Sequence, residues 1–199
     1  MKKLLFLFLL ISFASKAQVR EEGTVEVIPQ VIFSSYSYYN NSGNHSTPLK
    51  SISFGIACDY YFNDRWSLHS GFLAQTMGMD SSSITDKLNY LNVPLNANWH
   101  FGSTRKWYLN FGVTPSFLMQ ATEIIKSTNG SLEYNIKGVV QPVQLGLNYG
   151  IGYKIETSKA FSILIDYQEF YGLTKTNKEG SPFFNAGGNF NVGAVYHFK

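Results

Sequence analysis

The chain has a single cysteine, Cys58, and few of the residue spacings that reactive centres need. One cysteine can form neither an intrachain disulfide nor a cysteine metal cluster. The histidines show no HxH or HxxxH spacing, and no serine lies near a histidine in a recognisable nucleophile motif. The sequence therefore predicts no catalytic residue, no metal ligand and no cofactor. The four histidines are His45, His69, His100 and His197.

The chain also lacks an apolar run long enough to cross a membrane as a helix, which takes about 20 residues. Its one continuous apolar stretch, 4–11, follows Lys2 and Lys3 and precedes the small residues Ser15 and Ala17. A basic start, a short apolar core and small residues at the cleavage site are typical of a secretory signal peptide. We expect residues 1–17 to be removed before Gln18 and residues 18–199 to form one domain.

An excess of positive charge is missing once this segment is set aside. The full chain has 16 basic and 13 acidic residues, and segment 1–17 holds three lysines and no acid, which leaves 16 − 3 = 13 basic residues. A chain without net basicity has no stripe of cations to neutralise phosphates. We therefore expect no nucleic-acid partner.

What the sequence does have is alternation, most clearly over residues 143–155. Val143, Leu147 and Ile151 belong to an apolar series of odd positions, and small or polar residues such as Gln144 and Asn148 occupy the even ones. Successive side chains of a strand point to opposite faces, so this segment has one apolar and one polar face. Its thirteen residues exceed the nine to eleven or so that a tilted strand needs to cross a membrane. The eight segments with this pattern are 24–36, 50–62, 65–78, 90–101, 107–119, 142–155, 160–170 and 186–198.

The connections between these segments alternate in length. Residues 62–65, 102–106 and 156–159 are short turns, whereas 37–49, 79–89, 120–141 and 171–185 are long and polar. Short turns at one end and long loops at the other are typical of an outer-membrane barrel. The prediction is an all-β protein, an eight-stranded antiparallel up-and-down transmembrane β-barrel, with short periplasmic turns, periplasmic chain ends and long extracellular loops. Pro29 predicts a bend or bulge in the first strand.

Aromatic residues gather at the predicted strand ends, as expected for rings that favour the lipid–water boundary. All three tryptophans flank the short turns. They are Trp66, Trp99 and Trp107, accompanied by Tyr60, Tyr61, Phe62, Phe101, Tyr108, Tyr153, Phe161, Tyr196 and Phe198. The aromatics expected at the opposite rim are Tyr36, Tyr38, Tyr39, Phe117, Phe170, Tyr171, Phe183 and Phe184.

A soluble lipocalin-like barrel is the alternative, because it also has eight up-and-down strands but turns its apolar face inward. The polar face, rich in Gly, Asn and Ser with few charges, would be an unusual solvated surface. It is a suitable filling for a narrow barrel. The chain also has no Gly-x-Trp motif near residue 18.

The segments 61–68, 90–95, 107–117 and 193–198 are similar to the small outer-membrane β-barrel proteins of the Bacteroidetes, the PorT-like family. The similarity covers the whole chain after residue 17 and lies in the pattern rather than in a catalytic motif. It implies an eight-stranded OmpA- or OmpX-like barrel in the outer membrane of a Gram-negative cell. Members named for PorT are linked to protein secretion and gliding.

Three charged residues fall on the predicted inward face: Asp59, Lys154 and Asp166. Buried charges need partners, so ion pairing in the lumen accounts for them without catalysis. His69, His100 and His197 also point inward, on three different strands. We therefore expect a non-enzymatic integral outer-membrane protein, either structural or binding a partner through its loops. The alternatives are an outer-membrane lipid-modifying enzyme and an accessory component of protein secretion.

The partners that this interpretation implies are outer-membrane lipid, the barrel-assembly machinery during biogenesis, and an extracellular or envelope protein. The terminal strand supports the assembly machinery as a partner, because apolar and polar residues alternate along it up to Phe198, which Lys199 follows. Terminal aromatic strands of this kind resemble the signal that the assembly machinery reads.

Overall fold

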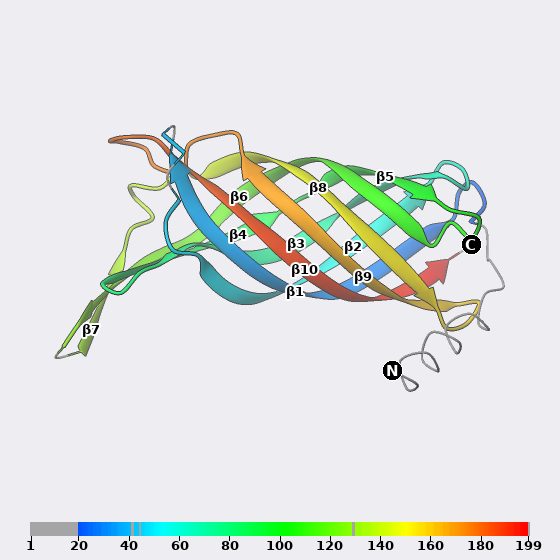
Figure 1. The fold of residues 1–199 in the computed structure, drawn as a ribbon, viewed down its shortest axis with the longest axis horizontal. Coiled ribbons are helices and arrows are strands. Elements are labelled where there is room, and N and C mark those ends of the chain that lie inside the picture. The colour runs from blue at the N-terminus through cyan, green and yellow to red at the C-terminus, as the bar shows by residue number, and fades with distance from the viewer. Residues whose placement is uncertain (1–19, 41, 44, 129, 199) are drawn as a thin grey trace, which may run out of the picture.

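The computed structural model describes residues 20–40, 42, 43, 45–128 and 130–198 and shows a closed antiparallel β-barrel (Figure 1). The expected signal peptide, 1–17, lies outside the described residues. In chain order the strands are β1 Val25–Asn40, β2 Leu49–Tyr61, β3 Trp66–Asp80, β4 Ile84–Asn92, β5 Leu95–Phe101, β6 Trp107–Ser127, β7 Gly130–Asn135, β8 Val143–Glu156, β9 Phe161–Gly172 and β10 Phe183–Phe198.

The barrel has eight crossings in this part of the chain, as the sequence predicts. Of ten strands, β7 pairs only with β6 as an appendage, and β4 and β5 are two pieces of one crossing. Pro94 interrupts that crossing, yet the register is the same on its two sides, against β3 throughout and against β6 from Tyr90 onward. β1 closes the ring because it pairs with both β2 and β10.

The register around the ring sets how steeply the strands tilt. A path from one paired residue to the next can be followed once around the ring. It starts at Ser35 on β1, passes Gly188, Glu169 and Tyr149, crosses β6, β5, β3 and β2, and ends at Val25. It therefore returns to β1 at a residue 35 − 25 = 10 positions nearer the turn end. Eight strands with this stagger tilt by roughly 40°, inside the usual range for outer-membrane barrels.

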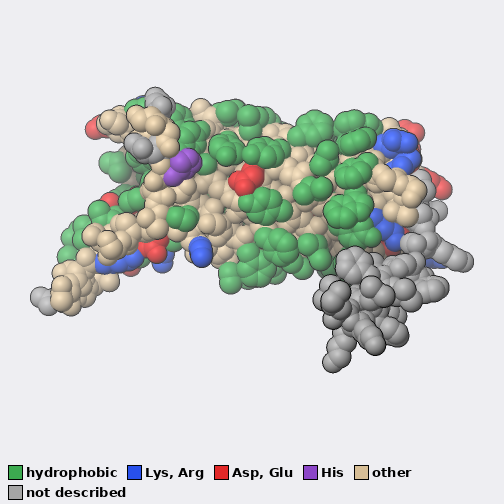
Figure 2. Space-filling view, in the orientation of Figure 1, with side chains coloured by type: hydrophobic (Ala, Val, Ile, Leu, Met, Phe, Trp, Pro, Cys, Tyr) green, Lys and Arg blue, Asp and Glu red, His purple; other side chains and the backbone are tan. Residues whose placement is uncertain are grey.

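The outer wall is apolar and the lumen is largely polar, so the predicted alternation is confirmed. Along β8, Leu147 is 44% exposed while Asn148 is 8% exposed. A soluble barrel would bury its apolar face, and the exposed wall excludes that alternative. Figure 2 shows the apolar side chains gathered over the barrel wall. Exposed apolar side chains on this wall include Ile52, Phe54, Ile56, Phe72, Leu95, Phe111, Tyr149 and Phe190. Within the described residues, no helix is both long enough and apolar enough to span a membrane.

We call the end with the short turns the turn end and the other the loop end. All three tryptophans lie at the turn end, as predicted, with Trp66 paired to Trp99 and Trp107 to Phe101. The prediction for several other aromatics is wrong. Tyr36, Tyr38, Phe170, Tyr61 and Tyr108 are buried in the lumen rather than placed on a lipid-facing rim.

The predicted loops are shorter than expected, because strands continue into them. β6 runs on to Ser127, eight residues beyond its predicted end, and forms with β7 a hairpin inside the predicted loop 120–141. This hairpin projects furthest from the loop end in Figure 1. The two-faced pattern fades there because inward residues such as Leu88 and Ala121 are apolar too. Pro29 causes no bulge, since the pairing register is the same before and after it; the bulge lies at Asn89/Tyr90.

Candidate functional site

The lumen near the turn end holds a buried charge network centred on Lys154 of β8. Its Nζ lies 2.5 Å from a carboxylate oxygen of Asp59 on β2 and 2.5 Å from one of Glu26 on β1. It also donates to the Tyr61 hydroxyl at 3.0 Å and lies 5.4 Å from the centre of that ring. The pairing of Lys154 with Asp59 is as predicted. One cation thus joins three strands across the barrel.

Glu26 is the most deeply buried of the charges that the sequence interpretation missed. It is fully buried and also contacts Arg20 Nε at 2.6 Å, while Arg20 in turn contacts Glu156 at 3.1 Å. Lys106 lies 3.4 Å from the same Glu156, so three cations face three carboxylates. Glu26 alternates with Val25 and Val27, and this position could have placed it on the inward face.

Asp166 contradicts the prediction that the inward charges form ion pairs. Its carboxylate accepts hydrogen bonds from the Tyr108 hydroxyl at 2.6 Å, Asn191 at 2.5 Å and Gln168 at 3.1 Å. All three donors are neutral. Asp166 is therefore stabilised by oriented polar groups, and it does not belong to the Lys154 network.

The three inward histidines do not meet at one point. His69 Nδ1 lies 2.6 Å from Asp59, His100 Nε2 lies 3.0 Å from the Ser67 hydroxyl, and His197 lies near Glu26. In residues 20–40, 42, 43, 45–128 and 130–198, no three His, Cys, Asp or Glu side chains are grouped to hold a metal ion. Each of these histidines takes part in a local hydrogen bond or ion pair of its own.

Two serine–histidine contacts were not expected from the sequence. Besides Ser67 and His100, the Ser162 hydroxyl lies 2.9 Å from His197 Nε2, and His197 Nδ1 lies 2.9 Å from Glu26. The order Ser–His–Glu is that of a nucleophilic triad. However, Ser162 is fully buried, and Lys154 and Arg20 occupy the Glu26 carboxylate. His197 Nδ1 also lacks hydrogen-bond geometry toward it. The arrangement therefore favours a structural bridge between β9, β10 and β1 over nucleophilic catalysis.

The loop-end half of the lumen is filled differently, by an apolar cluster. Tyr36 and Phe170 meet edge to face at 5.9 Å between ring centres, and Met77 and Leu88 are fully buried beside them. The cluster consists of Tyr36, Tyr38, Met77, Leu88, Tyr90, Leu118, Ala121, Val140 and Phe170. Because these side chains pack across the barrel, the two ends of the lumen have distinct chemistry, charged at the turn end and apolar at the loop end.

Above this cluster β4, β6 and β7 form a three-stranded projection, which we call the finger. Cross-strand pairing aligns Ile84, Ile125 and Leu132 in one row across its three strands. Ile125 is 37% exposed, Leu132 61%, and the nearby Tyr134 48%. In the described residues β7 pairs with β6 alone, so its other backbone edge is open. The finger therefore carries both an exposed apolar row and an unpaired strand edge.

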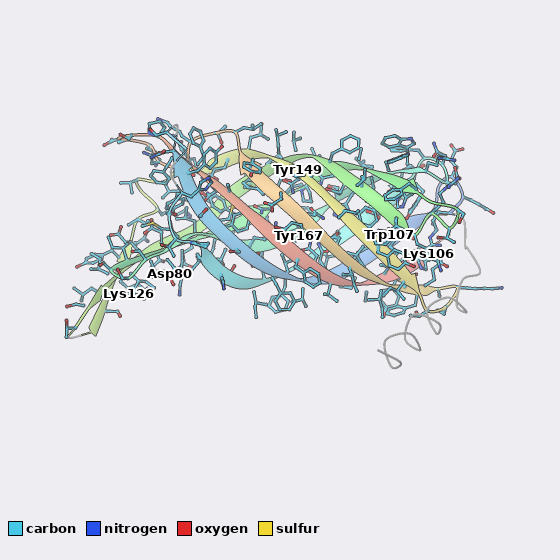
Figure 3. The ribbon with its side chains drawn as sticks, viewed as in Figure 1. Asp80, Lys106, Trp107, Lys126, Tyr149 and Tyr167 are labelled. Atoms are coloured by element: carbon cyan, nitrogen blue, oxygen red, sulfur yellow. The ribbon has the colours of Figure 1, made fainter. Side chains whose placement is uncertain are left out.

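Charges at the base of the finger are arranged to shift proton affinities. Burial raises the pKa of Asp86 to about 6, the charge of the paired Glu123 adds to this, and a hydrogen bond from the Tyr38 hydroxyl opposes it. On the exposed side, a hydrogen bond from Lys126 at 2.5 Å lowers the pKa of Asp80 (Figure 3). The Asp80–Lys126 contact ties the end of β3 to β6.

The solved structures that resemble this chain include three outer-membrane or surface proteins of bacteria. Ail, the attachment invasion locus protein of Yersinia pestis, is 18% identical, with 89% of this chain and 99% of that chain covered at a TM-score of 0.48. Neisserial surface protein A is 16% identical over 89% and 100%, at 0.49. OprG from Pseudomonas aeruginosa is 14% identical over 92% and 99%, at 0.49. No functionally curated protein matches the chain.

The family model described as the outer membrane protein beta-barrel domain matches residues 4–198, almost the whole chain. This agrees with the closed ring of strands and with the apolar outer wall. The chain belongs to the outer membrane protein beta-barrel domain family and is an outer-membrane protein.

Proposed function

We propose that this protein is a non-enzymatic outer-membrane barrel that binds a protein partner outside the cell through the finger of β4, β6 and β7. The observation that carries this proposal is the apolar row Ile84, Ile125 and Leu132, of which Ile125 and Leu132 are exposed, beside the open edge of β7. A polar loop would gain nothing from an aligned apolar row with two of its side chains exposed to water. Such a row stabilises a complex when a partner covers it.

The binding mode that fits is addition of a partner strand to β7. An unpaired edge offers a row of backbone donors and acceptors, and an extended segment of another chain can pair with it. Native edges are commonly protected by proline or by several charges. β7 has neither, since Glu133 is the one charged residue in its sequence GSLEYN. Leu132 and Tyr134 would then contact alternate side chains of the partner strand.

The proposal includes an orientation and a biogenesis that the chain's pattern supports. Residues 1–17 direct export, the barrel-assembly machinery inserts the chain, and the loop end faces outward. The short turns and both ends of the described chain lie together at the turn end, as expected for a periplasmic side (Figure 1). The resemblance to PorT-like proteins of the Bacteroidetes suggests a second role, in protein secretion. That role places the partner at the turn end.

Site-specific photo-crosslinking in the native host tests these roles. A photoreactive residue at Leu132 is expected to capture a protein, and one at Phe62, at the turn end, is expected to capture none. Leu132→Lys should abolish capture from position 134, whereas Ser131→Lys, on the opposite face of β7, should preserve it. Capture at Phe62 alone would replace the extracellular function with the secretion role. Capture at neither position would refute both.

The alternative of a lipid-modifying enzyme needs an exposed reactive group, and Ser162 is the nucleophile that the geometry offers. A fluorophosphonate probe should leave the parent protein unlabelled, because Ser162 is buried and the carboxylate of Glu26 is already neutralised by Lys154 and Arg20. Labelling that Ser162→Ala removes would establish the enzyme instead.

A further inference from the structure

One wall of the barrel, formed by β9, β10, β1 and β2, has an exposed lysine at the loop-end boundary of its apolar band; β9, β10 and β1 face the viewer in Figure 1. Lys50 of β2 lies 60 − 50 = 10 positions from Tyr60, which belongs to the turn-end rim. At a tilt of roughly 40° these ten positions span about 25 Å, the height of the apolar band of an outer-membrane barrel. The outward residues between the two include Ile52, Phe54 and Ile56.

The outward side chains of β1 become polar beside this lysine. In ascending order they are Val31, Phe33, Ser35, Ser37 and Tyr39, and Ser35 pairs with Lys50. Within the part of the chain that the structure describes, the hydroxyls of Ser35 and Ser37 have no hydrogen-bond partner, and Lys50 has neither a hydrogen bond nor an ion pair. One cation and two hydroxyls therefore lie together, without protein partners, directly above the apolar wall.

A groove of about 620 Å³ opens on this wall below the polar groups. Lys50 and Ser35 lie at its upper edge, and Tyr167 of β9 lies at its lower end (Figure 3). Gly188 of β10, between them, has no side chain, so nothing interrupts the groove there. The other large outward side chains that line it are apolar and exposed: Phe33, Ile52 and Phe190.

The stagger of the ring sets the depth of this groove. A step from one strand to its paired neighbour, going from β2 toward β9, descends about 3 Å at a tilt of roughly 40°. Three such steps lead from Lys50 to Glu169, and Tyr167 lies two positions lower on β9, so the groove descends about 15 Å below Lys50. That is the depth of one lipid layer in a hydrocarbon core about 30 Å thick. Glu169 is not part of the lining, and it accepts a hydrogen bond from Tyr167 about 9 Å below Lys50.

We propose that this wall binds one acylated glycolipid that has a phosphate on its sugar. The phosphate contacts the Lys50 ammonium, and the sugar hydroxyls form hydrogen bonds with the hydroxyls of Ser35 and Ser37. One acyl chain occupies the groove over Phe33 and Phe190. The vertical order of these contacts matches an inserted lipid, because the charged and polar groups of the site lie above its apolar groups.

Charge and position select this occupant. An ammonium without a protein partner favours an anion, and a phosphate forms charge-assisted hydrogen bonds with it. With the loop end outward, as proposed above, the groove lies in the outer lipid layer, which in Gram-negative cells consists of phosphorylated glycolipid. A soluble phosphate would leave the apolar groove uncovered. The inference rests on the proposed orientation and not on the partner of the finger.

The test is native mass spectrometry of the whole protein in detergent with equimolar amounts of three lipids of matched acyl chains. They are diacylglucosamine 1-phosphate, the same diacylglucosamine without phosphate, and phosphatidylglycerol. The phosphorylated glucosamine lipid should be retained about fivefold more than the phosphate-free one, the effect of one lysine beside an anionic lipid. Phosphatidylglycerol, which has a phosphate but no sugar, should also be retained less. Equal retention of the two glucosamine lipids, or phosphatidylglycerol retained as strongly as the phosphorylated one, would overturn the proposal.

Variants then assign the contacts. Lys50→Gln should equalise retention of the two glucosamine lipids, whereas Lys87→Gln, which changes an exposed lysine of β4 outside the groove, should preserve their ratio. Ser35→Leu, which fills the upper groove, should lower retention of both lipids, and Ser70→Leu, outward on β3, should not. A ratio that Lys50→Gln leaves unchanged would overturn the phosphate contact. No finger partner is present in this measurement, so its failure leaves the function proposed for the finger intact, and failed capture at Leu132 leaves this site intact.

Discussion

Removing the cation at the centre of the lumen network should destabilise the barrel strongly. In Lys154→Met, Glu26 and Asp59 each lose an ion pair of 2.5 Å, and Tyr61 loses a hydrogen-bond donor. Taking one partner from a buried pair typically costs about 3–5 kcal/mol, because the charge left behind has lost its compensation. Arg20 still neutralises Glu26 and His69 still contacts Asp59, so we expect the lower end, about 3 kcal/mol.

The assay is reversible urea unfolding in lipid vesicles, followed by tryptophan fluorescence. The double variant Lys154→Met/Asp59→Asn removes one charge of each sign and should be more stable than Lys154→Met alone by at least about 1 kcal/mol. Lys87→Met, on the exposed outer side of β4, is the control and should stay within about 0.5 kcal/mol of the parent. A cost below about 1 kcal/mol for Lys154→Met would refute the buried network, and so would an additive double variant.

Four further outcomes follow from the structure. Leu147→Arg should cost about 2–4 kcal/mol in bilayers, in a way that depends on lipid thickness, whereas Asn148→Arg should show no such dependence; equal responses would reject the assigned alternation. The folded protein should need detergent and migrate differently in mild SDS before and after boiling, and a soluble folded monomer would contradict this. Phe198→Ala, or loss of Phe198 and Lys199, should lower the outer-membrane fraction measured by cell fractionation, while parental levels would leave Phe198 as a rim anchor only. Because the folded-state pKa of Asp86 is raised to about 6, the finger should lose stability as pH rises from about 4 to 6, and Asp86→Asn should flatten that profile in hydrogen exchange of β4 amides.

The barrel could be predicted from the sequence because lipid imposes a simple rule on every strand. Outward residues must be apolar and lumen residues need not be, so Phe190, Val192 and Tyr196 identify β10 without knowledge of its neighbours. The same rule explains the errors. Tyr36 and Phe170 are aromatic residues near strand ends, which matches a rim, but they occupy the inward positions. The face that the alternation gives to a residue therefore predicts its place better than its aromatic character does.

The contacts of the lumen could not be predicted, because they join residues far apart in the chain. Lys154 and Glu26 are 128 positions apart, and Ser162 and His197 are 35 apart. Alternation shows that all four face inward but not which of them meet. That depends on the stagger with which the ring closes, and no local pattern specifies it. The finger was missed for a related reason: β7 is six residues long, all of them exposed, and it exists only as a pairing partner of β6.

The lumen network also explains how the sequence selects one register of the strands around the ring. A slip of one strand by two residues keeps every outward side chain outward, so the apolar wall, which lipid contacts without directional preference, would distinguish the two registers poorly. The same slip moves each lumen side chain by about 6.6 Å along its strand. Glu26 would then lie out of ion-pair range of Lys154, and Asp166 out of hydrogen-bond range of Tyr108. Since a slip of β1, β6, β8 or β9 would leave a buried charge without one of these partners, the polar lumen favours the observed register. Lys154→Met should therefore weaken the choice of register as well as the stability of the barrel.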